Sequence, residues 1–383
     1  MLKRSLDVTH YNDSLCLFGP RQTGKTCLIK ETLSPDIYID LLKHSEFLRY
    51  ANDVSLLSKE VQALSGRGKL LVVLDEIQRV PELLNEVHSL IERFKQAQFV
   101  LTGSSARKLR RAGVNLLGGR AITLHLHPFT SDELGESFSL DDALRFGTLP
   151  PVSLARDRQH KVRLLRSYVE TYLEEEVQRE ALTRNIPAFA RFLELSAFEN
   201  GHILNFQTLA RDVGVHAKTI KEYFQILEDT LLGFFLFPYG KSPRSRLVSH
   251  PKFYFFDSGV VRALRKELSS DLLPASPPYG DAFEHWVFLE MKRALDYRER
   301  VASLCVVRTT DGVEVDVILE RGSETWAIEI KASAAPQLSD VRGLRSFMRD
   351  HKVKRAICAC QTPRPYVADT IEFLPWQAFL KEV

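Results

Sequence analysis

Residues 19–26, with the sequence GPRQTGKT, fit the pattern GxxxxGK[ST] of a phosphate-binding loop. An apolar run at 15–18 precedes them and a helix-like run at 27–30 follows, which is the strand, loop and helix context that this motif requires. The glycines let successive backbone N–H groups point at a phosphate, and the following helix adds its positive N-terminal end. The sequence therefore predicts a binding site for ATP together with Mg²⁺.

Two side chains at the end of this loop have separate predicted roles. Lys25 is expected to reach the β- and γ-phosphates, and Thr26 is expected to offer its hydroxyl to Mg²⁺. The loop residues expected to contact the nucleotide are Gly19, Pro20, Arg21, Gln22, Thr23, Gly24, Lys25, Thr26 and Cys27.

An acidic pair follows a second apolar run. Residues 70–74, LLVVL, have the uninterrupted apolar character of a strand buried on both faces, and they end in Asp75 and Glu76. We expect Asp75 to hold Mg²⁺, directly or through water, and Glu76 to polarise the attacking water. Such a pair is also common as surface charge. Its position after a phosphate-binding loop favours the chemical role.

A third apolar run, at 98–101, ends in the sequence TGSS. If this strand lies between the two motif strands, its end lies beside the γ-phosphate. A short hydroxyl at that place can sense whether the phosphate is present. Taken alone, TGSS is simply a turn, and both interpretations stay open.

The segments GPRQTGKT, LDEIQRVPELL, FVLTGSSARKL and GGRAITLHLHPFT together resemble the AAA+-type predicted ATPases of bacteria and archaea that carry a C-terminal domain of unknown function. The resemblance covers essentially the whole chain. It implies that Ser104 is the sensor residue, and that an arginine from a neighbouring subunit of a homo-oligomer stabilises the transition state. Arg120 is the first choice for this finger, ahead of Arg107, Arg110 and Arg111, and a solvated basic surface is the alternative for each.

Composition excludes several classes of protein. A length of 383 residues predicts two or three domains, and a net charge of +3 is too small to indicate nucleic-acid binding by itself. The five cysteines have no zinc-site spacing, which favours reduced thiols. The first residues are too polar for a signal peptide and no apolar run is long enough to cross a membrane, so we expect a cytoplasmic protein with no membrane partner.

Changes of pattern along the chain predict an α/β protein with three parts. Residues 1–130 alternate apolar strands and amphipathic helices, as expected for an AAA+-like parallel sheet with helices on both faces. Residues 131–250 are expected to form a helical lid and a winged helix-turn-helix. Residues 251–383 are expected to form a second α/β domain.

The middle part contains a candidate DNA-contacting segment. Residues 207–215 and 216–227 read as two short helices, with Ala210, Gly214 and Ile220 where a helix-turn-helix needs a small contact, a turn glycine and a packed aliphatic. A β-hairpin is expected to follow as the wing. The residues expected to contact DNA are Lys218, Thr219, Lys221, Arg244 and Arg246. The alternative is a module used only for packing or for protein contacts.

The last part contains a second group of chemically active residues. Glu284 lies near the expected start of a helix, Asp316 lies on a strand, and Glu329 and Lys331 share one face of the next strand. This order resembles the PD-(D/E)xK nuclease fold. It implies that the three carboxylates hold Mg²⁺ and that Lys331 orients or deprotonates the water. One alternative is a structural ion-pair network. Another is a metal site in which Glu314 serves as the ligand instead of Glu284.

Two functions follow from these patterns. In the first, the protein is a Mg²⁺-dependent ATPase that binds DNA and processes it with the nuclease-like domain. In the second, it is an ATP-switched regulatory or binding protein with a protein partner and a catalytically inactive nuclease-like domain.

Overall fold

A computed structural model describes residues 2–104, 118–173, 185–240, 250–308 and 313–383. The chain forms two compact units: unit 1 contains residues 1–129 and 229–232, and unit 2 contains residues 130–228 and 233–383. The predicted residues Arg107, Arg110, Arg111, Arg244 and Arg246 lie outside the described residues.

Unit 1 is built on a parallel sheet of five strands in the order β2-β3-β4-β1-β5. The strands are β1 (Ser14–Phe18), β2 (Ile37–Asp40), β3 (Leu70–Asp75), β4 (Ala97–Gly103) and β5 (Ala121–His125). Strand β4 lies between the two motif strands β1 and β3. This order meets the condition under which the end of β4 can approach the γ-phosphate.

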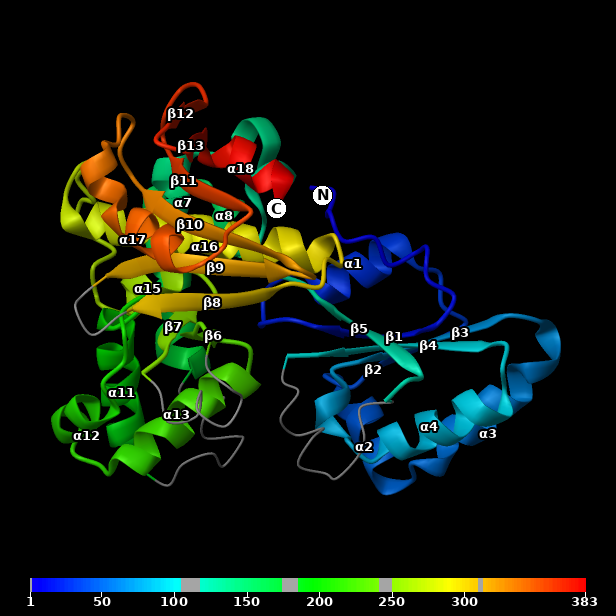
Figure 1. Ribbon diagram of the computed structural model, residues 1–383. Coiled ribbons are helices and arrows are strands. Elements are labelled where there is room, and N and C mark those ends of the chain that lie inside the picture. The colour runs from blue at the N-terminus through cyan, green and yellow to red at the C-terminus, as the bar shows by residue number, and fades with distance from the viewer. Residues whose placement is uncertain (1, 105–117, 174–184, 241–249, 309–312) are drawn as a thin grey trace. The chain divides into compact units, whose positions relative to one another are not determined.

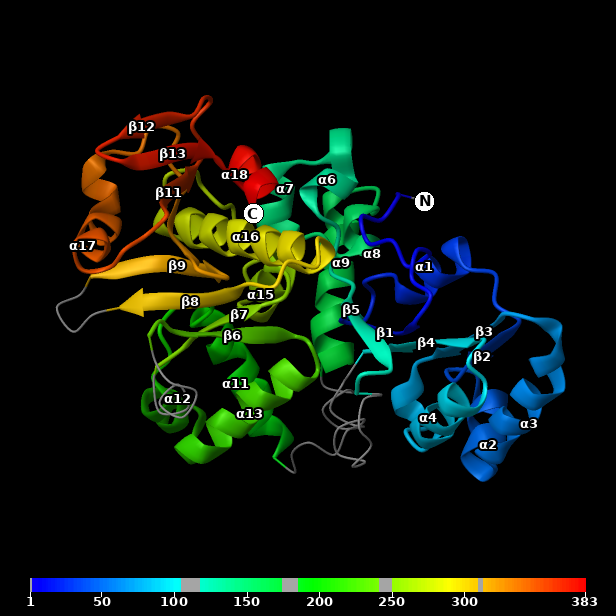
Figure 2. The same cartoon turned by 45° about the vertical axis from the view of Figure 1, so that its right-hand side comes forward.

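Helices cover both faces of this sheet, with α1 on one face and α2, α3 and α4 on the other (Figures 1 and 2). The strands are therefore apolar on both sides, and β1 is buried along its whole length. The helices are α1 (Lys25–Thr32), α2 (His44–Asn52), α3 (Ser55–Leu64) and α4 (Leu83–Arg93), with 3₁₀ turns η1 (Ser65–Arg67) and η2 (Ile77–Arg79).

Unit 2 begins with a helical section, as expected. Its elements are α6 (Ser131–Leu134), η3 (Gly135–Ser137), α7 (Leu140–Phe146), α8 (Pro150–Ser153), α9 (Arg158–Ser167), a π-helical turn η4 (Tyr168–Leu173), α11 (Ile186–Phe198), α12 (Phe206–Val213) and α13 (Ala217–Asp229). The turn between α12 and α13 uses Gly214 at φ 82°, a left-handed conformation that glycine adopts without strain. Ala210 and Ile220 are buried as expected, at 5% and 0% exposure.

A mixed sheet of eight strands follows, in the order β12-β13-β11-β10-β9-β8-β6-β7. The strands are β6 (Gly233–Pro238), β7 (Lys252–Phe255), β8 (Ser303–Arg308), β9 (Glu314–Arg321), β10 (Glu324–Lys331), β11 (Arg355–Cys360), β12 (Tyr366–Ala368) and β13 (Ile371–Pro375). The expected hairpin is present as β6 and β7, and β6 also pairs with β8. One sheet therefore spans the position near residue 250 at which the sequence predicts a division.

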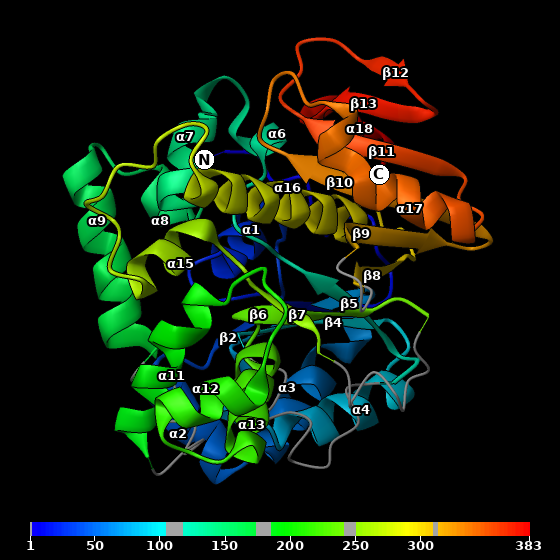
Figure 3. The same cartoon turned by 60° about the vertical axis from the view of Figure 1, so that its left-hand side comes forward.

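Two helices cover opposite faces of this sheet (Figure 3). Apolar residues of α16 pack with Ile328 and Ile357, whereas α17 packs with the alternate residues Ala327 and Cys358. The helices of this part are α15 (Ser258–Leu264), α16 (Pro277–Tyr297), α17 (Arg342–Asp350) and α18 (Trp376–Glu382), with a 3₁₀ turn η5 (Leu338–Val341).

Helix α16 begins earlier than the sequence pattern predicts. The expected start lies near residue 282, but Ser276 caps the helix by accepting a hydrogen bond from Tyr279 N, and prolines occupy its first two positions. Proline is favoured there because its fixed φ suits the first turn and no N–H is needed. Glu284 therefore lies in the second turn or later, within an established helix.

None of the described helices has both the length and the apolar character needed to cross a membrane.

Candidate functional site

The phosphate-binding loop connects β1 to α1 and needs glycine at two positions. A Cβ atom at residue 19 would lie 2.2 Å from the carbonyl oxygen of Leu126, so only glycine fits there without a backbone shift. Gly24 has φ 93°, which again favours glycine. Between them Thr23 is buried and donates to Pro20 O at 2.8 Å, which stabilises the curve of the loop.

The start of α1 fits an anion. Gly24 provides no side-chain cap for the first N–H groups of the helix, and the first turn holds no acidic residue. These groups and the helix dipole are therefore available to a phosphate. Of the other predicted loop contacts, Pro20 is buried, Arg21 is half-buried, and Gln22 and Cys27 are exposed.

Lys25 lies inside the loop rather than in solvent. It is 4% exposed, and its Nζ donates to Gly19 O at 2.8 Å and to Pro20 O at 3.1 Å. The loop carbonyls thus hold the ammonium group next to the N-terminus of α1. Its position agrees with the predicted role at the phosphates.

Thr26 and Asp75 meet although they are far apart in the sequence. Thr26 Oγ1 donates to Asp75 Oδ2 at 2.8 Å. The same carboxylate accepts hydrogen bonds from Tyr38 Oη at 2.7 Å and from Thr102 Oγ1. A hydroxyl beside a carboxylate is an oxygen donor set of the kind that Mg²⁺ prefers, so the residues present fit this ion.

Glu76 and Ser104 also come together at this edge of the sheet. Ser104 Oγ donates to Glu76 Oε2 at 3.4 Å, and Gln78 Nε2 donates to both side chains. The main-chain N–H of Glu76 donates to Thr102 Oγ1 at 2.9 Å. The strand order explains the cluster, because the carboxyl ends of β3 and β4 are neighbours.

Arg120 lies at the other edge of the sheet. It precedes β5, whose first residue Ala121 pairs with Ser14, whereas the loop follows Phe18, which pairs with His125. These two pairs are separated by roughly 13 Å of strand. Arg120 is instead paired with Glu92, whose Oε1 lies 2.6 Å from its Nη2. It therefore does not reach the phosphate-binding loop of the same chain.

The four residues of the predicted nuclease-like site, which belongs to unit 2, lie around β9 and β10. Lys331 Nζ lies 2.7 Å from Glu329 Oε1 and 3.9 Å from Asp316 Oδ2, which confirms that Glu329 and Lys331 share a face. Asp316 also accepts a hydrogen bond from the main-chain N–H of Ile330 at 2.8 Å. Glu284 joins the group from α16.

A second lysine at this cluster was not predicted from the sequence. Lys252 of β7 is 2% exposed, and its Nζ lies 3.2 Å from Glu284 Oε1 and 2.9 Å from Glu314 Oε1. Tyr254 Oη donates to the same Glu284 oxygen at 2.8 Å. Glu284 and Glu314, the two alternatives for one ligand position, therefore share one ammonium group.

Burial and mutual repulsion alter the acidity of two carboxyls in this cluster. Burial, together with the charge of Glu284, raises the pKa of Asp316 to about 6. Burial, together with the charge of Asp316, raises the pKa of Glu329 to about 8. Over the described part of the chain, no three His, Cys, Asp or Glu side chains are arranged as a preformed metal site. The carboxylates of this cluster form ion pairs with Lys252 and Lys331 instead.

The predicted DNA-contacting residues of α13 are on its surface. Lys218 and Lys221 are exposed and Thr219 is half-buried. Lys221 Nζ lies 5.3 Å from the centre of the Phe206 ring, so its ammonium group lies over the face of that ring. An open hollow beside the turn is lined by Arg211 of α12, Gly214 and His216 of the turn, and Thr219 and Tyr223 of α13, among other residues.

Comparison with known families identifies the domain that contains the first of these sites. Residues 11–135 match a family described as an AAA domain. This part of the chain is an AAA-type, P-loop ATPase-like domain. Residues 137–271 and 279–379 match two families that are each described as a domain of unknown function, DUF8612 and DUF4143.

Most of this chain is also similar to proteins that are themselves named as uncharacterized. An uncharacterized protein of Mycobacterium tuberculosis is 27% identical over 378 residues, covering 98% of this chain and 82% of the relative, and one of Mycobacterium bovis gives the same values. An uncharacterized protein of Haemophilus influenzae is 24% identical over 345 residues, covering 82% of this chain and 80% of the relative. The crystal structure of protein VC1899 from Vibrio cholerae is 13% identical, with 91% and 89% of the two chains covered, but its TM-score of 0.18 supports no argument about fold.

Three polar residues of the AAA domain site were missed in the sequence: Tyr38, Thr102 and Gln78. Thr102 stands next to the carboxyl end of β4, where a parallel sheet gathers its functional side chains. Tyr38 is the second of the four residues of β2, and Gln78 lies two residues after Glu76, in η2. Position at a strand end was therefore the available signal for Thr102, whereas nothing in the sequence places Tyr38 or Gln78 beside the acidic pair.

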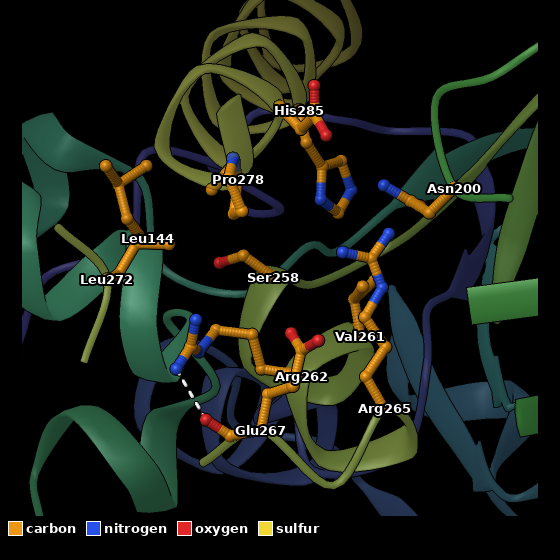
Figure 4. A pocket seen from close by; sticks show the side chains of 12 residues that line it. Leu144, Asn200, Ser258, Val261, Arg262, Arg265, Glu267, Leu272, Pro278 and His285 are labelled. Carbon is orange, nitrogen blue, oxygen red and sulfur yellow. Dashed lines mark hydrogen bonds between the residues drawn. The ribbon is translucent and has the colours of Figure 1, made fainter. Parts of the chain in front are cut away.

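A pocket in unit 2, between α15 and α16, is too small for a ligand (Figure 4). Its volume of about 20 Å³ has room for about one water molecule. His285 points into it, and its Nε2 hydrogen-bonds to Phe255 O at 2.7 Å. The pocket is therefore part of the packing of unit 2 and does not compete with the sites described above.

Proposed function

We propose that this protein is a Mg²⁺-dependent ATPase whose hydrolytic site is the carboxyl edge of β1, β3 and β4. The observation that carries the proposal is the hydrogen bond of 2.8 Å between Thr26 Oγ1 and Asp75 Oδ2, which brings the two predicted metal ligands together from separate elements. Bound Mg²⁺ would neutralise phosphate charge at this position. Lys25 and the N-terminus of α1 bind the phosphates, and Glu76 polarises the attacking water.

The test is ATP turnover by the full chain with Mg²⁺ and with a chelator. Lys25→Ala should reduce turnover to background, because the ammonium that binds the β- and γ-phosphates is lost. Glu76→Gln should bind ATP but hydrolyse it at least about 100-fold more slowly. Lys59→Ala, which removes an exposed lysine of unit 1 paired with Asp53, is the matched control and should not change turnover. Equal rates in Lys25→Ala and the unaltered chain would reject the proposal.

We further propose that DNA is the partner of this ATPase and that α13 contacts it. Lys218 and Lys221 are exposed on the helix that follows a tight turn, and their charges are in a position to neutralise phosphates. ATP turnover should increase with one of linear, nicked or single-stranded DNA, and DNA affinity should fall as salt rises. The double change Lys218→Ala with Lys221→Ala should abolish this stimulation without changing the basal rate. Turnover that is indifferent to all three DNAs would favour the regulatory alternative with a protein partner.

The cluster of unit 2 supports a second candidate function, metal-dependent cleavage of DNA. The specific observation is Glu329 Oε2, a buried carboxylate oxygen that has no hydrogen-bond partner among the described residues, beside Asp316 and Lys331. Under this proposal the protein nicks plasmid DNA with Mg²⁺ or Mn²⁺, and Asp316→Ala and Lys331→Ala do not. Nicking that persists in both variants would indicate a contaminating nuclease. If no form nicks DNA, the cluster is the structural ion-pair network and the protein is an ATP-switched binding protein.

A further inference from the structure

Gln78 is a buried polar side chain between the two groups on which the proposed hydrolysis depends. It belongs to η2, directly after the acidic pair, and 5% of it is exposed. Its Nε2 donates to Glu76 Oε2 and, at 3.0 Å, to Ser104 Oγ. Ser104 Oγ also lies 3.4 Å from the same Glu76 oxygen. The base, the amide and the hydroxyl therefore form a closed triangle.

The backbone is arranged to make this triangle. Glu76 has φ 62° and ψ 49°, a left-handed conformation that is uncommon for a residue with a side chain and that recurs at functional sites. This bend ends β3 and turns the chain back, so that Gln78 of η2 lies against the carboxylate of Glu76. On the neighbouring strand, a Cβ atom at Gly103 would lie 2.8 Å from Gln78 Oε1, so glycine gives the amide its place.

The other end of the amide is unsatisfied. Gln78 Oε1 is buried and has no hydrogen-bond partner among the described residues. Rotation of the carboxamide by half a turn would bring this oxygen to Ser104 but would also set it against the carboxylate of Glu76, where two acceptors repel. An apolar side chain of the same length would fill the space without an unpaired buried acceptor, which destabilises a fold. Packing alone therefore does not account for a glutamine at this position.

We propose that Gln78 is a positioning residue of the ATPase site. Its amide holds Glu76 Oε2, so that Glu76 Oε1, which accepts no hydrogen bond within the described residues, is left for the attacking water. The water oxygen bonds to the γ-phosphorus and its proton passes to Glu76. The bond from that phosphorus to the β–γ bridging oxygen breaks with its electron pair, which leaves ADP and phosphate. The hydroxyl proton of Ser104 is then able to turn to the γ-phosphate while Gln78 keeps its contact with both partners.

The inference rests on the proposed ATPase function and is tested by Gln78→Met, which keeps the length of the side chain and removes its polar atoms. We expect kcat to fall about 10- to 100-fold, the loss that is typical when a residue that orients a functional side chain is removed. The affinity for a fluorescent ATP analogue should change less than threefold. The midpoint of chemical unfolding should stay the same or rise, because the unpaired acceptor is gone. If Gln78 had only a structural role, the midpoint of chemical unfolding would fall in Gln78→Met.

Gln98→Met is the matched control. Gln98 lies near the start of β4, at the other end of the strand from Ser104, and its Nε2 donates to Tyr11 O at 3.0 Å and to Asp13 O at 2.9 Å. This change should lower stability and leave kcat unaltered. In a double-mutant cycle, Gln78→Met combined with Ser104→Ala should lower kcat by less than the product of the two single reductions, because both residues act on one carboxylate.

The outcomes distinguish a failure of the role of Gln78 from a failure of the proposed ATPase function. If the unaltered chain shows no turnover that depends on Lys25, the ATPase function itself fails. If turnover is present and Gln78→Met has the kcat of the unaltered chain, only the role of Gln78 is overturned. A loss of nucleotide affinity equal to the loss of kcat would assign Gln78 to structure and would also overturn it. Gln78→Ala serves as the second variant if the methionine variant does not fold.

Discussion

At the scale of single residues, one carboxylate organises each of the two polar sites. Asp75 accepts hydrogen bonds from Thr26, Tyr38 and Thr102, which come from three different elements. In unit 2, Glu284 receives Lys252 and Tyr254 in a similar way. A buried carboxylate needs such partners because an uncompensated charge away from water is costly. The residues that surround each predicted acid are therefore as much a part of the site as the acid.

Replacement of Lys252 by methionine should destabilise unit 2 by about 2 kcal/mol, because two partly buried carboxylates would lose their shared buried cation. Burial by itself lowers the pKa of this lysine, but the surrounding acidic groups outweigh it and raise the pKa, so the ammonium stays charged. The chain has 3 tryptophans, all of them in unit 2 at 286, 326 and 376, so the fluorescence of tryptophan during urea unfolding reports on this unit.

The matched control is Lys266→Met. Lys266 is paired with Glu194 at 2.7 Å, but its side chain is 74% exposed, so this change should alter stability by less than about 0.5 kcal/mol. Equal effects of the two substitutions would show that the carboxylates of the cluster do not depend on Lys252.

At the scale of elements, the packing of α17 on β9 depends on one glycine. A Cβ atom at Gly343 would lie 1.8 Å from the carbonyl oxygen of Glu314, which is backbone and cannot move aside alone. Gly343→Ala should therefore force the helix and the strand apart and cost about 1–3 kcal/mol in unfolding free energy. The same tryptophan fluorescence measures this change.

A second helical glycine provides the contrast. A Cβ atom at Gly280 of α16 meets no atom within 4 Å. Gly280→Ala should stabilise the protein by up to about 1 kcal/mol, because alanine has the higher helix propensity. If both alanines destabilise the protein equally, contact between α17 and β9 is not the reason for glycine at 343.

At the scale of the whole molecule, Arg120 can serve catalysis only from another subunit, since it lies at the edge of the sheet away from its own loop. If it is the finger of a homo-oligomer, Arg120→Ala should lower turnover by about 10³-fold and retain ATP binding. A mixture of the Lys25→Ala and Arg120→Ala proteins should regain activity, because mixed contacts join an intact loop to an intact arginine. Arg93→Ala is the control. A mixture no more active than its components would remove Arg120 from this role.

The stability of unit 2 should also depend on pH through His285. Burial, with smaller contributions from Arg265 and Arg293, lowers the pKa of His285 to about 3, against the hydrogen bond to Phe255 O. At a pH below the ordinary histidine pKa of about 6.5, His285 binds a proton in the unfolded chain but not in the folded chain. The contribution of His285 to the free energy of unfolding is therefore fully present above pH 6.5 and falls as the pH decreases from 6.5 towards 3. The loss attributable to this residue is about 2 kcal/mol at pH 5.

The measurement compares urea unfolding at pH 7 and pH 5 for the unaltered chain and for His285→Gln, which keeps a donor for Phe255 O. The variant should lose less stability over this interval. His88→Gln, at a histidine whose side chain is 45% exposed, should have the same pH dependence as the unaltered chain. Identical slopes for His285→Gln and the unaltered chain would contradict a neutral buried imidazole.

The sequence by itself determined those features that depend on local pattern. The glycine spacing at 19–26 and the apolar runs before the loop and before Asp75 identified an α/β fold and the AAA domain, because parallel strands buried on both faces leave a characteristic signal. The order of Glu284, Asp316, Glu329 and Lys331 along the chain likewise predicted which side chains would meet.

Only the tertiary structure decided which distant residues complete these sites. Tyr38 and Thr102 reach Asp75 because the strand order places β2 and β4 on either side of β3, and that order is not encoded in any local motif. Lys252 reaches the carboxylates of unit 2 because the hairpin of β6 and β7 joins the same sheet as β8 and β9. Sheet order is fixed by the packing of all strands and helices together, so contacts across it become visible only when the chain is folded.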